Sequence, residues 1–199
     1  MRYLYYLIMC LLLMSCKEAF DMHPYDVRFD GQDNINHTNI QRIEKACEGK
    51  DTLRIAFIGD THGWYSDTKD MVNDIKGRSD LDFVVHLGDP TDCGTSKESV
   101  WLRDILAGIP VPYVAVIGNH DFLGTGDQVF HAMYGDNDYT FIAGRVKFVC
   151  LNTNATEYDY LAAVPNLDFM ESEIRKDSAL FYRSVVCMHA RPYSEQFNN

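Results

Sequence analysis

The amino-acid sequence predicts an α/β fold in which strand–helix–strand units place several strand ends at one edge of a sheet. Three short apolar runs each end at a glycine, and a helix-like segment separates each run from the next. The runs recur about every thirty residues, which is the length of one strand–helix–strand unit. With 46% hydrophobic and 24% charged residues in 199, the chain can form one sizeable core.

The first sixteen residues are typical of an exported lipoprotein. Arg2 precedes an apolar run, Tyr3–Met14, that is too short to span a bilayer. The run ends in Leu-Met-Ser-Cys, which resembles a bacterial lipobox, so we expect cleavage before Cys16 and a lipid on its sulfur. An ordinary cleaved signal or a buried helix is the alternative. Because Lys17 is not the Asp that favours inner-membrane retention, the resemblance implies an outer-membrane anchor, on the periplasmic or surface face of a bacterial cell envelope.

Three segments are expected along the chain. They are a signal peptide at 1–15, a tether with an outer helix at 16–50, and a catalytic domain at 51–199. Residues 33–36 are typical of a turn, and the helix is indicated only by Ile40, Ile43 and Ala46.

The elements of the catalytic domain follow from apolar runs and helical periodicity. Strands are expected at 53–58, 83–87 and 113–117, a hairpin at 139–142 and 146–151, a last strand at 184–188, and helices at 67–76, 97–107 and around 167–174.

Polar side chains follow the ends of four of these strands. The clusters are Asp60-Thr61-His62, Gly88-Asp89-Pro90-Thr91-Asp92, Gly118-Asn119-His120-Asp121 and a single His189. Ligands in open α/β sheets collect at the carboxyl ends of strands, so these side chains are expected to converge. A carboxylate can bridge two cations, whereas an imidazole nitrogen or an amide oxygen binds one, which makes Asp89 the natural bridge in a two-metal site.

The ordered series of clusters resembles the signature of calcineurin-like metallophosphoesterases, from about Leu53 to Pro192. The resemblance implies a sandwich of two mixed β-sheets flanked by helices, αββα, which some schemes class as α+β. It also implies metal-dependent hydrolysis of phosphomonoesters or phosphodiesters, with a small phosphoester as the substrate.

The resemblance further implies how the side chains divide between two divalent metal ions, Mn, Fe or Zn. Asp60, His62 and Asp89 would hold the first, and Asp89, Asn119 and His189 the second. A hydroxide that bridges the metals would be the nucleophile.

The remaining polar residues of the clusters receive different roles. In the family, the residue that matches His120 is the general acid, and Asp92 resembles the carboxylate that pairs with it and fixes its tautomer. A turn-forming cap is the alternative for Asp92, and a structural salt bridge or cap is favoured for Asp121. Purple acid phosphatases place a Tyr after the bridging Asp, and the corresponding positions here are Pro90, Thr91 and Asp92, so the sequence argues against that branch.

One family motif is missing. Members carry a later Gly-His-x-His whose histidines give one ligand to each metal, and no such motif occurs before Asn199. The sequence is therefore interpreted as a member that is incomplete at its C-terminus. The alternative function is a metal-binding or interaction lipoprotein that keeps the scaffold with impaired catalysis.

The net charge disfavours one class of partner, and a few other side chains have candidate roles. The formal net charge is −11, and no run of Lys or Arg interrupts it, which disfavours nucleic acid as a large-surface partner. Cys150 and Cys187 lie in strand-like runs, where packing is the favoured role, although a disulfide is allowed. His86 is expected to be a packed strand residue or a support for the metal site. Trp64 could stack on an aryl or nucleoside leaving group or pack in a lid.

Overall fold

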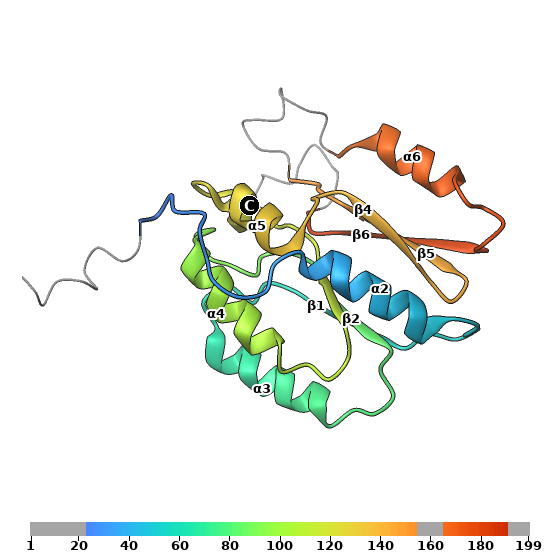
Figure 1. The fold of residues 1–199 in the computed structure, drawn as a ribbon, viewed down its shortest axis with the longest axis horizontal. Coiled ribbons are helices and arrows are strands. Elements are labelled where there is room, and N and C mark those ends of the chain that lie inside the picture. The colour runs from blue at the N-terminus through green and yellow to red at the C-terminus, as the bar shows by residue number, and fades with distance from the viewer. Residues whose placement is uncertain (1–22, 155–164, 191–199) are drawn as a thin grey trace, which may run out of the picture.

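The computed structural model describes residues 23–154 and 165–190, and it contains two three-stranded sheets between layers of helices (Figure 1). The first sheet holds β1 (Ile55–Ile58), β2 (Phe83–His86) and β3 (Tyr113–Ala115), and the second holds β4 (Tyr139–Ala143), β5 (Val146–Leu151) and β6 (Arg183–Met188). The first sheet is parallel throughout its described strands. The second is mixed, because β4 and β5 form an antiparallel hairpin and β6 joins β5 in parallel. The predicted fold class is confirmed.

Helices cover the sheets at their outer faces and edges. They are α2 (Ile35–Cys47), α3 (Tyr65–Lys76), α4 (Ser96–Leu106), the short 3-10 helix η2 (His120–Phe122), α5 (Gly126–Tyr134) and α6 (Leu167–Arg175). In Figure 1, α3 and α4 lie beneath the first sheet, and α6 lies above the second. Among the residues that the structure describes, no helix is both long and apolar enough to cross a bilayer. The signal-like segment and Cys16 lie outside these residues.

Two hydrophobic cores follow from the alternation of side chains along β2. Val84 faces α3, α4 and α5, where it packs with residues such as Leu102 and Phe130. Phe83 and Val85 face the second sheet, and the core between the sheets also contains Cys150 and Cys187, both free and buried as the packing interpretation predicts. Successive strand residues point to opposite faces, so one fully buried strand serves both cores. The first sheet is thereby held rigidly from both sides.

The region expected to contain a turn at residues 33–36 instead starts a helix, because α2 begins at Ile35. The side chain of Asn36 donates to the carbonyl of Ala115 at 2.9 Å and accepts from its amide at 2.8 Å. Asn39 donates to a second carbonyl of the same strand at 2.7 Å. The side-chain amides of these two residues thus form hydrogen bonds with the main chain at the outer edge of β3, where the main-chain groups would otherwise lack partners. Local turn preference is overridden by this tertiary pairing.

Candidate metal centre

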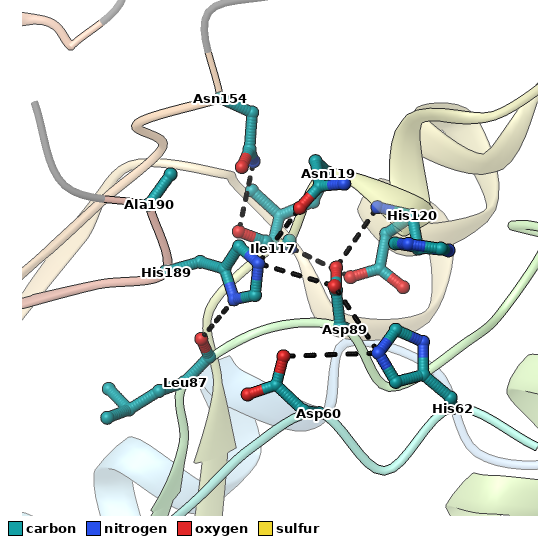
Figure 2. Close-up of polar contacts among 12 residues, drawn as sticks. Asp60, His62, Leu87, Asp89, Ile117, Asn119, His120, Asn154, His189 and Ala190 are labelled. Carbon is teal, nitrogen blue, oxygen red and sulfur yellow. Dashed lines mark hydrogen bonds and ion pairs between the residues drawn. The ribbon is translucent and has the colours of Figure 1, made fainter. Parts of the chain in front are cut away.

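The loops after β1, β2 and β3 and the end of β6 meet at the carboxyl edge of the first sheet (Figure 2). The structure brings together all five side chains predicted as metal ligands: Asp60, His62, Asp89, Asn119 and His189. They come from four segments that are far apart in sequence. The parallel strands place the first three loops side by side, and the packing of the second sheet brings in the fourth segment.

Asp89 lies at the middle of this group and is only 3% exposed. Its Oδ2 atom lies 3.6 Å from Nε2 of His62 and 3.3 Å from Nε2 of His189. Its Oδ1 atom accepts a hydrogen bond from the amide of His120 at 3.0 Å. The carboxylate therefore faces histidines of both halves of the site, as a bridging ligand must.

His189 is oriented by a main-chain group. Its Nδ1 atom lies 2.9 Å from the carbonyl oxygen of Leu87, which can only accept, so Nδ1 carries the proton. Nε2 then points at Oδ1 of Asn119, 3.0 Å away, and at Asp89. A metal-binding histidine is commonly fixed in this way by a hydrogen bond from its other nitrogen. Three atoms with lone pairs thus converge, and such a set is satisfied by a cation or a proton between them.

The pKa shifts of Asp89 and His189 agree with their contact. Burial opposes ionisation of Asp89, but the hydrogen bond and charge of His189 outweigh it and hold the pKa of Asp89 below its ordinary value. Burial likewise opposes protonation of His189, but Asp89 raises the pKa of this imidazole. The arrangement of Asp89 and His189 therefore favours a positive charge beside the buried carboxylate.

Among the described residues, three sets of three side chains have ligand atoms close enough to hold an ion, one of them Asp92, Cys93 and Glu98, and two sets overlap at the candidate centre. The overlapping sets are His62, Asp89 and His120, and Asp60, Asp89 and His189, each with its ligand atoms within 4.8 Å of one another. Both sets share Asp89. The mixture of carboxylate and imidazole suits several first-row divalent metals, so the residues present fit the metals that the sequence implies.

His120 lies beside Asp92, but through a different contact from the expected one. Nδ1 of His120 donates to the main-chain carbonyl of Asp92 at 2.8 Å, whereas the carboxylate Oδ1 lies 3.6 Å away. The same carboxylate lies 3.8 Å from Nδ1 of His62. The carbonyl therefore fixes the tautomer of His120 and leaves Nε2 as the nitrogen that can face a substrate. A main-chain partner has no signature in residue type, so the sequence could not show it.

Three of the predicted ligands have a left-handed backbone. The φ angles are 52° at Asp60, 38° at His62 and 55° at Asp89. Residues other than glycine rarely adopt such angles, which are costly unless the surroundings enforce them. Two hydrogen bonds between the loops do so: the amide of Asp60 donates to the carbonyl of Gly88 at 3.0 Å, and that of His62 to the carbonyl of Asp89 at 3.1 Å.

His86 contacts the loop after β1, which carries Asp60 and His62. This strand residue is fully buried, and its Nε2 atom lies 3.0 Å from the hydroxyl of Thr61, between the two ligands of that loop. Its Nδ1 atom has no hydrogen-bond partner among the described residues. Burial lowers the pKa of His86 to about 3, so the ring is neutral. The sequence predicted a packed residue, and the contact with Thr61 adds support for the site.

Asp121 joins the second and third loops. Its Oδ1 atom accepts from the amide and the hydroxyl of Thr91, at 3.1 and 2.7 Å, and its Oδ2 atom accepts from the amide of Gly118 at 2.8 Å. Burial raises the pKa of Asp121 to about 7. Asp121 makes structural contacts, but they are hydrogen bonds rather than the expected salt bridge, and they join the loops that present Asp89 and Asn119.

Gly118 has no room for a side chain. A Cβ atom at this position would collide with the carboxylate and the amide of Asp89. The glycine of the third cluster thus allows the backbone after β3 to approach the buried carboxylate closely.

Fold and site together define an α/β sandwich protein with a candidate centre for divalent cations at the strand ends. Residues 53–198 match the calcineurin-like phosphoesterase family, and the chain belongs to this family.

Two similar proteins give further context. A 3′,5′-cyclic-nucleotide phosphodiesterase of Nostoc sp. is 29% identical over 100 residues, which are 49% of this chain and 37% of that protein. The structure of a purple acid phosphatase from yellow lupin seeds superposes with a TM-score of 0.56 at 17% identity, over 72% of this chain and 31% of the other. At this identity the likeness shows a shared fold. The chain thus spans about a third of the length of each.

Proposed function

We propose that the protein hydrolyses small phosphomonoesters or phosphodiesters at a centre of two divalent metal ions. The observation that carries this proposal is the convergence of His189 Nε2, Asp89 Oδ2 and Asn119 Oδ1, with the imidazole oriented by a main-chain carbonyl. Family membership supports the reaction class. The cyclic-nucleotide phosphodiesterase activity named for the Nostoc relative supports phosphodiesters as substrates.

The chain would divide its ligands around Asp89. Asp60 and His62 would complete one position, and Asn119 and His189 the other, with Asp89 shared. Mn, Fe or Zn bound there would neutralise the phosphate charge and provide hydroxide near neutral pH. The hydrogen bonds between the loops would hold Asp60, His62 and Asp89 in place before substrate arrives, which would reduce the reorganisation needed for reaction.

His120 is the candidate general acid. With Nδ1 bound to the carbonyl of Asp92, the Nε2 atom faces away from that hydrogen bond and is available for substrate. As the bond between phosphorus and the leaving oxygen breaks, His120 in its imidazolium form would give its Nε2 proton to the departing alkoxide and keep its Nδ1 proton on the carbonyl of Asp92. Removal of such an acid typically reduces the rate about 10²- to 10⁴-fold.

The experiment compares two carboxylate variants, Asp89→Asn at the centre and Asp136→Asn at an exposed position whose side chain is 80% accessible. Bound metal is measured by elemental analysis, and hydrolysis is measured on 4-nitrophenyl phosphate and bis(4-nitrophenyl) phosphate with Mn²⁺. We expect Asp89→Asn to lose both metal and activity, and Asp136→Asn to retain both.

The outcomes separate the two functions that the sequence left open. Metal binding that depends on Asp89 without hydrolysis of any ester would favour the metal-binding lipoprotein. Hydrolysis that persists in Asp89→Asn would contradict the proposed site.

We also propose that the protein is anchored to the bacterial outer membrane through lipid on Cys16, which lies outside the described residues. The support is the Leu-Met-Ser-Cys sequence after a short apolar run. Cells that express the protein are labelled with a palmitate analogue, with Cys16→Ala as the test and Cys10→Ala as the matched control. Label that persists in Cys16→Ala would contradict the anchor.

A further inference from the structure

A pocket of about 470 Å³ opens beside the metal centre. It is lined by His62, Gly63, Trp64, Asp92 and His120. Its volume lies within the range of small-molecule sites. The candidate acid and one candidate ligand therefore line the same pocket as Trp64. A substrate whose phosphate lies at the metals would extend its leaving group past His120 into this space.

The backbone of Trp64 is fixed at the edge of the pocket. Its amide donates to the carbonyl of Thr61 at 3.0 Å, and its carbonyl accepts from the amide of Thr68 at 2.9 Å and from the hydroxyl of Thr68 at 2.7 Å. Trp64 is nevertheless 67% exposed. The main chain is thus held in place while most of the ring remains open to solvent.

The neighbouring aromatic residue behaves differently. Tyr65 packs edge-on against Trp101, with ring centroids 5.5 Å apart, in the interface of α3 and α4. Within the described part of the chain, no aromatic ring contact involves Trp64. A single exposed apolar residue is ordinary on a protein surface. What distinguishes Trp64 is its place on the wall of the pocket that contains His120, with a backbone that is already ordered.

We propose that Trp64 forms the leaving-group subsite of the centre and that it binds a planar aromatic group, such as an aryl ring or a nucleobase, by stacking. This inference rests on the proposed function. An indole on an ordered backbone provides a large flat surface with only two side-chain torsions to restrict. Stacking on an aromatic side chain depends on a flat ring rather than on specific hydrogen bonds. The subsite would therefore favour aromatic over aliphatic esters without selecting one base.

A binding experiment tests the subsite without catalysis. Phenylphosphonate and butylphosphonate both carry the phosphate-like group on a P–C bond that is not hydrolysed as an ester, and they differ in the flat ring. Calorimetry in the presence of Mn²⁺ compares them on the wild-type protein, Trp64→Ala, Trp64→Phe and the control Trp101→Phe. Because the chain has two tryptophans, Trp101→Phe also leaves Trp64 as the sole indole reporter of fluorescence.

We expect the wild-type protein to bind phenylphosphonate about fivefold or more tightly than butylphosphonate, since stacking of one ring typically contributes at least that factor. The preference should disappear in Trp64→Ala, persist in part in Trp64→Phe and persist fully in Trp101→Phe, where phenylphosphonate should change the emission of Trp64. Equal affinity for the two phosphonates, or an equal preference in Trp64→Ala, would overturn the proposal.

A kinetic experiment keeps this proposal distinct from the proposed function. The ratio of kcat/KM for Trp64→Ala to that of the wild-type protein is measured on phenyl phosphate and on glycerol 2-phosphate. A loss confined to phenyl phosphate supports the subsite, and an equal loss on both esters overturns it while hydrolysis stands. If the wild-type protein hydrolyses neither these monoesters nor bis(4-nitrophenyl) phosphate, the proposed function fails, and the phosphonate preference alone decides the role of Trp64.

Discussion

The imidazole of His189 occupies the space that a side chain at Gly88 would need. A Cβ atom at Gly88 would lie 2.6 Å from Cγ and Nδ1 of His189, and Gly88 has a φ angle of 101°. The two residues follow strands of different sheets, β2 and β6. The centre is therefore complete only when the second sheet is packed on the first.

Gly88→Ala should displace His189 and weaken metal binding. We expect about a tenfold or larger loss of Mn²⁺ affinity by calorimetry, because a metal ligand is moved. Gly135→Ala is the matched control, since Gly135 has a φ of 106° and a Cβ atom there would meet no atom of the described residues within 4 Å. Both variants carry backbone strain, of about 1–3 kcal/mol, but only one displaces a ligand. Equal metal affinity in the two variants would contradict the role of this contact.

Asp121→Asn should destabilise the second and third loops. The amide can still accept from Thr91, but its NH₂ group would face the N–H of Gly118, so one buried hydrogen bond becomes a contact of two donors. We expect a loss of about 1–3 kcal/mol in the free energy of unfolding, measured with urea. Asp136→Asn, at an exposed position, should change it little. Retention of full stability by Asp121→Asn would show that the hydrogen bonds of Asp121 to Thr91 and Gly118 do not stabilise the loops.

His86 should make the protein less stable in weak acid. Its folded-state pKa of about 3 lies below the ordinary value of 6.5, so below pH 6.5 the unfolded chain binds a proton that the folded chain excludes. This contribution to stability is therefore complete above pH 6.5 and is lost as the pH falls toward 3. Between pH 7.5 and 5.5 it amounts to about 1.4 kcal/mol.

The measurement is urea unfolding at the two pH values with a chelator present. Nearby Asp89 favours protonation of His86, while His62 and His189 oppose it, so the variants are compared with the wild-type protein under identical conditions. His86→Gln, which does not titrate, should reduce the dependence on pH by this amount. His131→Gln, at an exposed histidine, should leave it unchanged. The same pH dependence in His86→Gln would exclude the buried imidazole as its source.

Asp92→Ala should reduce hydrolysis much less than His120→Ala does. The tautomer of His120 is set by the main-chain carbonyl of residue 92, which alanine retains. We expect less than about a tenfold loss of kcat for Asp92→Ala and at least about a hundredfold loss for His120→Ala on an alkyl ester such as glycerol 2-phosphate, whose leaving oxygen needs a proton. Comparable losses would show that the carboxylate, and not the carbonyl, governs the acid.

Much of the architecture could be predicted because it depends on local pattern. Apolar runs and helical periodicity located the strands and most helices to within a few residues, but α5 and η2 were not predicted. The regular spacing of the strand–helix–strand units implied that their ends share one edge. The same reasoning placed Asp60, Asp89 and Asn119 together, since the carboxyl ends of parallel strands converge in any open α/β sheet.

The sequence by itself thus determined the α/β class, the order of the clusters and the residue types suited to divalent cations. Tertiary structure alone decided that Asn36 pairs the edge of β3, that His86 supports Thr61, and that a carbonyl rather than a carboxylate orients His120. The physical reason is that main-chain partners have no signature in residue type. Contacts between distant side chains likewise depend on how the two sheets pack, which no local pattern encodes.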